Sequence, residues 1–166
     1  MTALNRNPQN TNFLQPTKFL LTFNRIGSLQ YFCQSVNLPG ISLDDVNRTT
    51  PFLDIYSPGT KLTYNPLNVT FIVDENLSTW TSLQNWFNSI ANPKGFEGRK
   101  PAPKDAFSDA TLTILTNLNN SNLKVQYYNV FPTSLTDIDF DTKLSADDII
   151  TASATFRYEY YEILTA

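Results

Sequence analysis

Histidine is absent from this chain of 166 residues, and Cys33 is its single cysteine. An intrachain disulfide is therefore excluded, and zinc sites or thiol–histidine catalysis would lack their usual side chains. The sequence also contains none of the motifs GxxxxGKS/T, GxGxxG, HExxH, CxxC and GxSxG, which bind nucleotides or zinc or position a nucleophile. We therefore expect neither an enzyme nor a bound cofactor.

Charged residues make up 16% of the chain, which is few for a protein that is soluble on its own. The net charge is −3 at pH 7 and the pI is near 4.8, which argues against a dedicated nucleic-acid clamp. The apolar fraction of 41% suffices for one hydrophobic core, and the length suits a single domain over residues 1–166. Either asparagine, threonine and serine keep the surface soluble, or other chains cover much of it.

Residues 65–90 pass from one hydrophobic periodicity to another. Alternate positions from Leu67 to Val73 are apolar, which is typical of a strand that is buried on one face. After a turn at 74–76, apolar residues recur every three or four positions, as on the buried face of a helix. These residues are Leu83, Trp86, Phe87 and Ile90. The sequence predicts a strand followed by a helix over 78–91, which Ser78 caps and Asn92-Pro93 ends.

Most other apolar segments alternate with period two. Residues 19–23 and 29–36 flank a glycine-containing turn, which predicts a hairpin. Strands are also expected over 110–116 and 123–130, the second of which ends at Phe131-Pro132-Thr133, and over 150–163 as one long terminal strand. The chain should therefore be mainly β with one flanking α-helix.

Two segments are predicted to extend away from this body. Residues 1–16 are polar and have few apolar anchors, which indicates an extended N-terminal arm. Residues 41–64 contain two β-prone runs, and we expect them to form a projecting hairpin, because long loops without structure are unusual in a compact domain. Its apolar side chains then need cover, from their own core or from a neighbouring subunit. The candidate interface residues are Phe52, Leu53, Ile55 and Tyr56.

A basic stretch and an acidic stretch allow more than one interpretation. Residues 92–108 hold four basic side chains between prolines and glycines, and a solvated surface loop is a better account than a phosphate contact. Residues 137–141 alternate aspartate with Ile138 and Phe140, which predicts a strand with one acidic face formed by Asp137, Asp139 and Asp141. With Asp148 they loosely match a calcium loop, but Thr142 occupies the position of the required glycine, so the strand is favoured.

Short motifs in fixed order extend over nearly the whole chain. They comprise a polar arm, a strand after Pro16, Phe32-Cys33 before Leu38-Pro39-Gly40, a long hairpin, an Asp-Glu turn before a Trp-bearing helix, Phe131-Pro132-Thr133, Asp139-Phe140-Asp141 and an aromatic terminal strand. In this order of elements the chain resembles the tail tube proteins of T4-like contractile-tailed bacteriophages, and the related ring protein of type VI secretion.

That resemblance implies a β-sandwich or split barrel whose sheet continues between subunits into a ring. It implies six copies in each ring, and rings that stack into the inner tube of a contractile tail, through which DNA leaves. Tail sheath, baseplate and tube terminator proteins are the implied partners, with assembly in the host cytoplasm and a final location in the virion. The three aspartates at 137, 139 and 141 are then candidates for the channel lining, because an acidic wall repels DNA.

Three alternatives stay open at this point. A tube initiator or terminator protein would share the same fold. A soluble β-rich ligand-binding module could use a tyrosine platform formed by Tyr127, Tyr128, Tyr158, Tyr160 and Tyr161. An enzyme of unrecognised type is the least favoured of the three.

Overall fold

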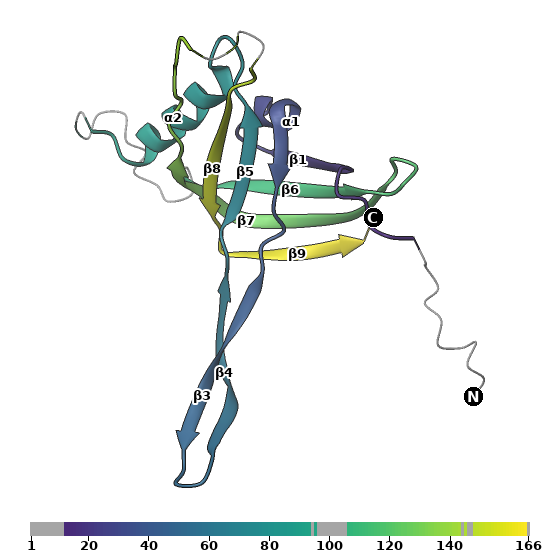
Figure 1. Cartoon of the computed structure of the whole chain (residues 1–166), viewed down its shortest axis with the longest axis vertical. Coiled ribbons are helices and arrows are strands. Elements are labelled where there is room, and N and C mark those ends of the chain that lie inside the picture. The colour runs from purple at the N-terminus through teal and green to yellow at the C-terminus, as the bar shows by residue number, and fades with distance from the viewer. Residues whose placement is uncertain (1–11, 94, 96–105, 144, 146–147, 166) are drawn as a thin grey trace.

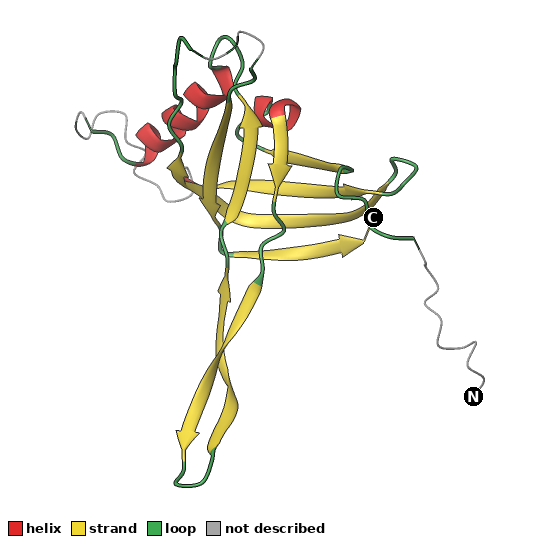
Figure 2. Cartoon of the chain, in the orientation of Figure 1, coloured by secondary structure: helices red, strands yellow, loops and turns green. Residues whose placement is uncertain are grey.

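The computed structural model describes residues 12–93, 95, 106–143, 145 and 148–165 (Figure 1). Most of the predicted arm and the basic side chains Lys94, Arg99, Lys100 and Lys104 therefore lie outside the described residues. The described part holds nine strands and two helices, which makes the chain mainly β as predicted (Figure 2). The strands are β1 Phe19–Phe23, β2 Cys33–Val36, β3 Ile41–Thr49, β4 Asp54–Tyr64, β5 Leu67–Ile72, β6 Ser108–Leu115, β7 Ser121–Leu135, β8 Thr151–Arg157 and β9 Tyr160–Thr165, and the helices are α1 Ser28–Phe32 and α2 Ser78–Ile90.

Strand β7 belongs to two packed sheets that cross at a steep angle (Figure 1). Its first part pairs with β6 and β9, in the order β1-β6-β7-β9, and its last part pairs with β8, in the order β7-β8-β5-β2. The strand bends at Asn129, whose φ of 54° is in the left-handed region that asparagine tolerates better than most residues. The described strands form an open arrangement rather than a closed barrel, which fits the predicted sandwich.

The core lies between the two sheets. Along β5 and β8, alternate residues are buried and the residues between them face outward, as period-two patterns require. The largest fully buried side chains include Trp86, Tyr127, Phe71, Phe156, Leu21 and Leu29. Phe156 is central to this cluster, because its ring lies 4.9 Å from that of Phe23 and 6.0 Å from that of Trp86.

Helix α2 is capped by Asp74 rather than by Ser78. One carboxylate oxygen of Asp74 accepts hydrogen bonds from the backbone N–H and the hydroxyl of Ser78, and the other accepts from the N–H of Thr79. The Ser78 hydroxyl is the main cause that lowers the pKa of Asp74. The residue before the helix, Leu77, is left-handed with φ of 53°, so the chain turns sharply and brings Asp74 over the helix start. Among the described residues, no helix is long and apolar enough to cross a membrane.

The predicted hairpin of residues 19–36 is wrong. Strand β1 pairs with β6, and β2 pairs with β5, so the two segments do not pair with each other. Between them the chain forms the short helix α1, and Leu29 is fully buried while Ile26, three positions earlier, is nearly so. Gly27 between them already has helical φ and ψ, so both side chains reach the core at the start of α1, which the alternation of residues 29–36 concealed.

The predicted ends of the last strands are also wrong. Strand β7 continues through Pro132, because its last part has β8 on one side only and there is a register shift between Pro132 and Ser134. The terminal strand is interrupted after Arg157, and β9 turns into the other sheet to pair with β7. Tyr158 is therefore buried, whereas Tyr160 is 38% exposed.

Candidate assembly surface

Residues 41–64 form the antiparallel hairpin β3/β4, which extends far from the body on the side opposite the two helices (Figure 1). All nine residues of β3 are exposed, as are most of those of β4. The alternative that this segment folds back onto its own core is therefore wrong. The hairpin is built from backbone pairing, such as Ile41 with Tyr64 and Thr49 with Asp54, and leaves its side chains uncovered.

The four candidate interface residues lie together at and next to the hairpin tip. Phe52 and Leu53 are in the turn and are 98% and 70% exposed, while Ile55 and Tyr56 begin β4 and are 50% and 64% exposed. Thr50 holds the turn through two hydrogen bonds with Leu53. The N–H of Thr50 donates to the carbonyl of Leu53 at 3.2 Å, and the hydroxyl of Thr50 accepts from the N–H of Leu53 at 3.1 Å. An ordered turn thus presents two large apolar side chains to solvent.

The exposed apolar surface is larger than these four residues. It continues along both strands toward the body, where about half of each side chain is exposed. These further residues are Ile41, Leu43, Val46 and Leu62. Sequence reasoning missed them because their spacing is also that of a strand with one buried face, and only the three-dimensional isolation of the hairpin reveals that they lack cover.

A bulge divides the hairpin into two parts. The pairing register shifts between Leu43 and Asp45, and Gly59 lies opposite this point. A Cβ atom at Gly59 would be 2.4 Å from the carbonyl oxygen of Asp44, closer than real atoms approach. Only glycine fits there, and because bulges increase local twist, the bulge rotates the tip relative to the base of the hairpin.

Tyrosine side chains fix the base of the hairpin to the body. The hydroxyl of Tyr158 donates to the carbonyl of Asn65 at 2.8 Å, and that of Tyr161 donates to the carbonyl of Pro39 at 3.3 Å. Both acceptors flank the hairpin, and the ring of Tyr64 packs against the two tyrosines at 5.8 and 5.5 Å. Burial raises the pKa of Tyr158 to about 12, so its hydroxyl remains a donor at neutral pH.

The tyrosine platform proposed for a ligand-binding module does not form. Tyr127 and Tyr158 are buried, and burial raises the pKa of Tyr127 well above its usual value. The Tyr127 hydroxyl lacks a hydrogen-bond partner among the described residues. Tyr128 and Tyr160 do stack with ring centroids 4.7 Å apart, but two rings are a small surface for a ligand.

Asp137, Asp139 and Asp141 are exposed, but they do not lie on a strand. The chain leaves β7 at Leu135 and passes them in an irregular segment, in which Ile138 packs against the core and Phe140 is 79% exposed. The predicted strand is wrong because no neighbouring strand of the described part is available to pair with it. No group of three acidic or cysteine side chains among the residues that the structure describes could hold a metal ion.

Several sheet edges are open in the described fold. In one sheet the outer strands are β1 and β9, and in the other they are β2 and the last part of β7. Edge strands offer unpaired backbone groups to another chain, and proteins usually protect them when they stay monomeric. On β9, Ile163 and Leu164 are 57% and 42% exposed, so this edge is both unpaired and apolar.

Comparison with known proteins shows which family this chain belongs to. The model of the phage tail tube protein family matches residues 7–164. The chain belongs to that family. The tail tube terminator protein of Enterobacteria phage T4 is 26% identical to it over 159 residues, covering 92% of this chain and 89% of the phage T4 protein.

Two solved structures share the fold. The tube-terminating cap of the anti-feeding prophage matches with a TM-score of 0.71, 17% identity and full coverage of both chains. The sheath/tube terminator complex of the extracellular contractile injection system PVC matches with a TM-score of 0.66 and 18% identity, over 94% of this chain and 100% of the other. The resemblance read from the sequence is thus confirmed, and the chain is a structural protein related to the phage tail tube.

Proposed function

We propose that this tail tube family protein is a tube terminator, which forms a ring at the end of the tube of a contractile phage tail. The similarity to the phage T4 tail tube terminator, over 92% of the chain, carries this proposal. This similarity favours the terminator over the tube body, although the sequence alone had favoured the tube body. The protein would assemble in the host cytoplasm and remain in the virion tail.

The two pairs of sheet edges support ring formation. Neighbouring strands within each sheet are antiparallel, so the two outer strands of a four-stranded sheet run in opposite directions. The edge of one copy can therefore pair antiparallel with the opposite edge of the next, and the same contact repeats around a closed ring. Six copies, as the family resemblance implies, would bury the edges that the monomer leaves open.

The hairpin is the element that reaches the neighbouring component. Phe52, Leu53, Ile55 and Tyr56 would be covered by the last ring of tail tube protein, and tail sheath protein is a second proposed partner. Burying one such side chain contributes about 1.5–3 kcal/mol, so a ring of hairpins would bind the tube end firmly. An initiator at the baseplate would use the same hairpin at the opposite end of the tube, and the experiment below separates the two.

DNA would pass through the ring without specific binding. Asp137, Asp139 and Asp141 are exposed carboxylates, and a ring of them in the channel would repel phosphates. Asp137→Lys combined with Asp139→Lys should leave the ring intact and slow genome release, with a smaller effect at high salt because salt screens charge over about 8–10 Å. Normal release at low salt would place these residues outside the channel.

Assembly with the cognate tail tube protein tests the main proposal. The purified chain alone should form rings without growing into tubes, as seen by negative-stain electron microscopy. Added to tube protein that is polymerising, it should shorten the tubes and label the end that lies farthest from the baseplate. Long homopolymeric tubes would instead support the tube body, a label at the baseplate end would support an initiator, and a strict monomer would refute assembly.

A further inference from the structure

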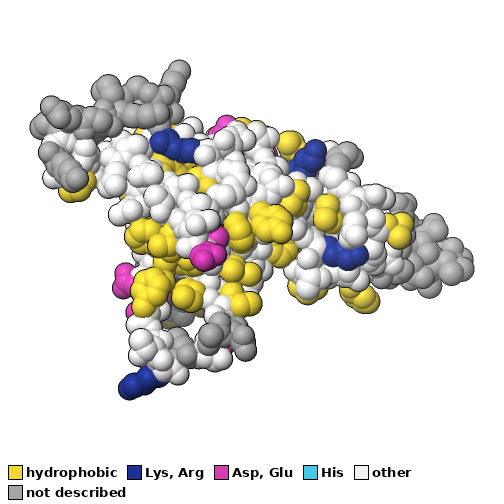
Figure 3. All heavy atoms as spheres, turned by 90° about the horizontal axis from the view of Figure 1, so that it is seen from above, with side chains coloured by type: hydrophobic (Ala, Val, Ile, Leu, Met, Phe, Trp, Pro, Cys, Tyr) yellow, Lys and Arg dark blue, Asp and Glu magenta, His cyan; other side chains and the backbone are white. Residues whose placement is uncertain are grey.

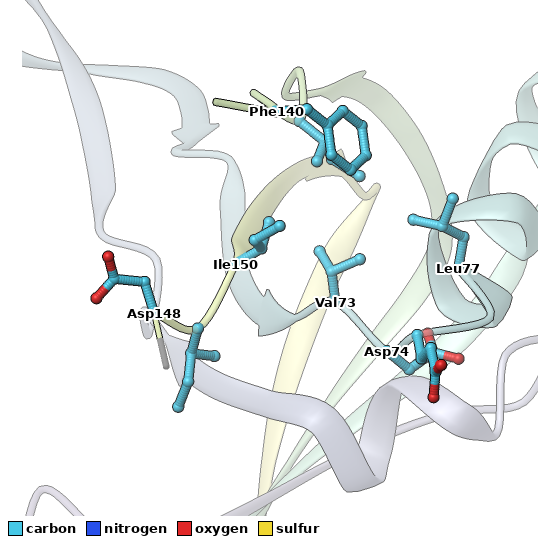
Figure 4. Close-up of a pocket in the computed structure, with 9 residues that line it drawn as sticks. Val73, Asp74, Leu77, Phe140, Asp148 and Ile150 are labelled. Atoms are coloured by element: carbon cyan, nitrogen blue, oxygen red, sulfur yellow. The ribbon is translucent and has the colours of Figure 1, made fainter. Parts of the chain in front are cut away.

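The end of the molecule opposite the hairpin carries an apolar groove. Seen from that end, hydrophobic side chains gather into a patch with acidic side chains at its border (Figure 3). Two adjoining pockets of about 520 and about 400 Å³ share Phe140, Asp148 and Ile150 as lining residues. In the larger pocket, Val73, Leu77, Phe140 and Ile150 point into a common space, with Asp74 and Asp148 on opposite sides of it (Figure 4).

The walls of this groove are held in place by a hydrogen bond between two distant segments and by local hydrogen bonds of two carboxylates. The N–H of Val73 donates to the carbonyl of Ile150 at 2.9 Å, which joins the end of β5 to the segment before β8. The carboxylate of Asp148 accepts from the N–H of Ser145 at 3.2 Å, and that of Asp74 caps α2. Both charged groups at the border of the groove are therefore fixed before any partner arrives.

Two apolar side chains of the groove, Phe140 and Ile149, do not pack against the core. Ile138 packs against the core, but Phe140, two positions later, is 79% exposed, and Ile149 is 69% exposed. Neither exposure is explained by the hairpin, which extends from the other end of the molecule (Figure 1). Adjoining pockets with exposed phenylalanine and isoleucine walls are typical of a surface that another chain covers.

The charge around the groove indicates the kind of chain. The two pockets are lined by five acidic residues, whereas no lysine or arginine of the described residues lines either of them. These acidic residues are Asp74, Glu75, Asp139, Asp141 and Asp148. Such a surface repels nucleic acid and acidic protein segments, and it attracts segments that carry lysine or arginine.

We propose that this groove binds a protein segment of a second tail component, in which apolar side chains stand between lysines or arginines. The proposal rests on the terminator function, because a ring that ends a tube must present one end to the tube and the other to a different partner. The hairpin serves the first end and the groove the second. The apolar side chains of the partner would cover Phe140 and Ile149, and its basic groups would meet the acidic border.

A pair of synthetic peptides tests this assignment on the full chain. One is a short amphipathic peptide with leucine and phenylalanine between lysines, and the other has glutamate in place of each lysine. Titration calorimetry should show binding of the lysine peptide and none of the glutamate peptide. Phe140→Ser, and separately Asp139→Asn with Asp148→Asn, should weaken binding about tenfold or more, while Phe13→Ser, at a 91% exposed phenylalanine outside the groove, should leave it unchanged.

The possible outcomes separate the groove from the terminator function. Equal binding of both peptides, no binding of either, or full binding by the Phe140→Ser variant would overturn the proposed partner chemistry. Loss of ring assembly in that variant would show that a second copy of this chain occupies the groove, and would overturn it too. Failure to label tube ends, with peptide binding intact, would refute the terminator and leave the groove as a binding site.

Discussion

The strand pairs β3/β4 and β5/β8 obey the same pairing rules but end in opposite environments. In β5/β8, the paired residues Val69 and Ala154 are both fully buried, and the polar residues between them face outward. In β3/β4, the paired residues Leu43 and Leu62 are each more than half exposed. Apolar alternation thus creates a face that needs to be buried, but the rest of the fold decides whether another element packs on that face.

The difference between the pairs follows from what packs on them. The inner face of β5/β8 meets the crossed sheet and the aromatic side chains Phe23 and Trp86. The hairpin has no second layer in the described structure, and an isolated pair of strands is marginally stable in water. We infer that the body stabilises itself, whereas the hairpin depends on assembly.

Replacing Phe52, Leu53 and Ile55 together with serine should have the largest effect on that contrast. Association with tail tube protein should be lost, because each side chain contributes about 1.5–3 kcal/mol when it is buried in a contact. The Tm of the isolated chain should not change, since all three side chains are already exposed. Co-sedimentation with tail tube protein and thermal unfolding measure the two properties, with Thr60→Ala on the same hairpin as control. A lowered Tm with intact association would mean that the hairpin belongs to the core.

Phe156→Ala should produce the opposite result. Its ring is fully buried between Phe23 and Trp86, and its removal should lower the free energy of unfolding by about 3–5 kcal/mol. Urea unfolding followed by tryptophan fluorescence reports this loss. An effect below about 1 kcal/mol would show that the body is not the self-sufficient part of the molecule.

Gly59→Ala tests the role of the bulge between the tip of the hairpin and its base. The added methyl group meets the carbonyl of Asp44, and overpacking of this kind typically costs about 1–3 kcal/mol. Because the bulge is outside the body, we expect weaker association with tail tube protein and an unchanged Tm. Gly27→Ala is the matched control, since a Cβ there has no neighbour within 4 Å. Equal association by both variants would show that the bulge is not needed to orient the tip of the hairpin.

Substitutions at the junction between the body and the hairpin should have smaller effects. Tyr158→Phe and Tyr161→Phe each remove one hydroxyl that donates to a carbonyl beside the hairpin. Each loss should lower the stability of the junction by about 0.5–1.5 kcal/mol. The backbone amides next to the freed carbonyls should then exchange their hydrogens faster. Hydrogen exchange at residues 38–66 measures this, and Tyr128→Phe, which removes an exposed contact with Glu162, is the control. Unchanged exchange would show that the hydroxyls do not hold the hairpin.

The smallest expected effect is a pH dependence confined to the body. Hydrogen bonds from Ser78 and Thr79 lower the pKa of Asp74 in the folded chain, so its cap stabilises the fold fully above the unfolded pKa of about 3.9. That contribution is lost as the pH falls through the lower folded pKa. As the pH is lowered from 6, the Tm should therefore fall less for Asp74→Asn than for the natural chain. Parallel curves would contradict this role of Asp74.

Local patterns predicted the elements whose signals were consistent. The strand at 67–72 and helix α2 follow from spacings that allow one periodicity each. Prediction failed where one residue pattern suits two structures, as at Leu29, or where a proline falls on a sheet edge, as at Pro132. The candidate interface residues proved to lie together on the hairpin, but the groove around Phe140 gave no local signal, because its walls come from three separate segments.

By itself, the sequence determined the β-rich composition, the amphipathic helix α2, the apolar tip of the hairpin and the membership of the tail tube family, since each depends on residue types and short spacings. Only the tertiary structure decided which apolar faces are covered, because burial depends on contacts between distant segments. It crossed the two sheets at Asn129, isolated β3/β4 from the core, and joined Val73 to Ile150 at the wall of the groove. Packing of this kind is a property of the whole chain, and no local spacing specifies it.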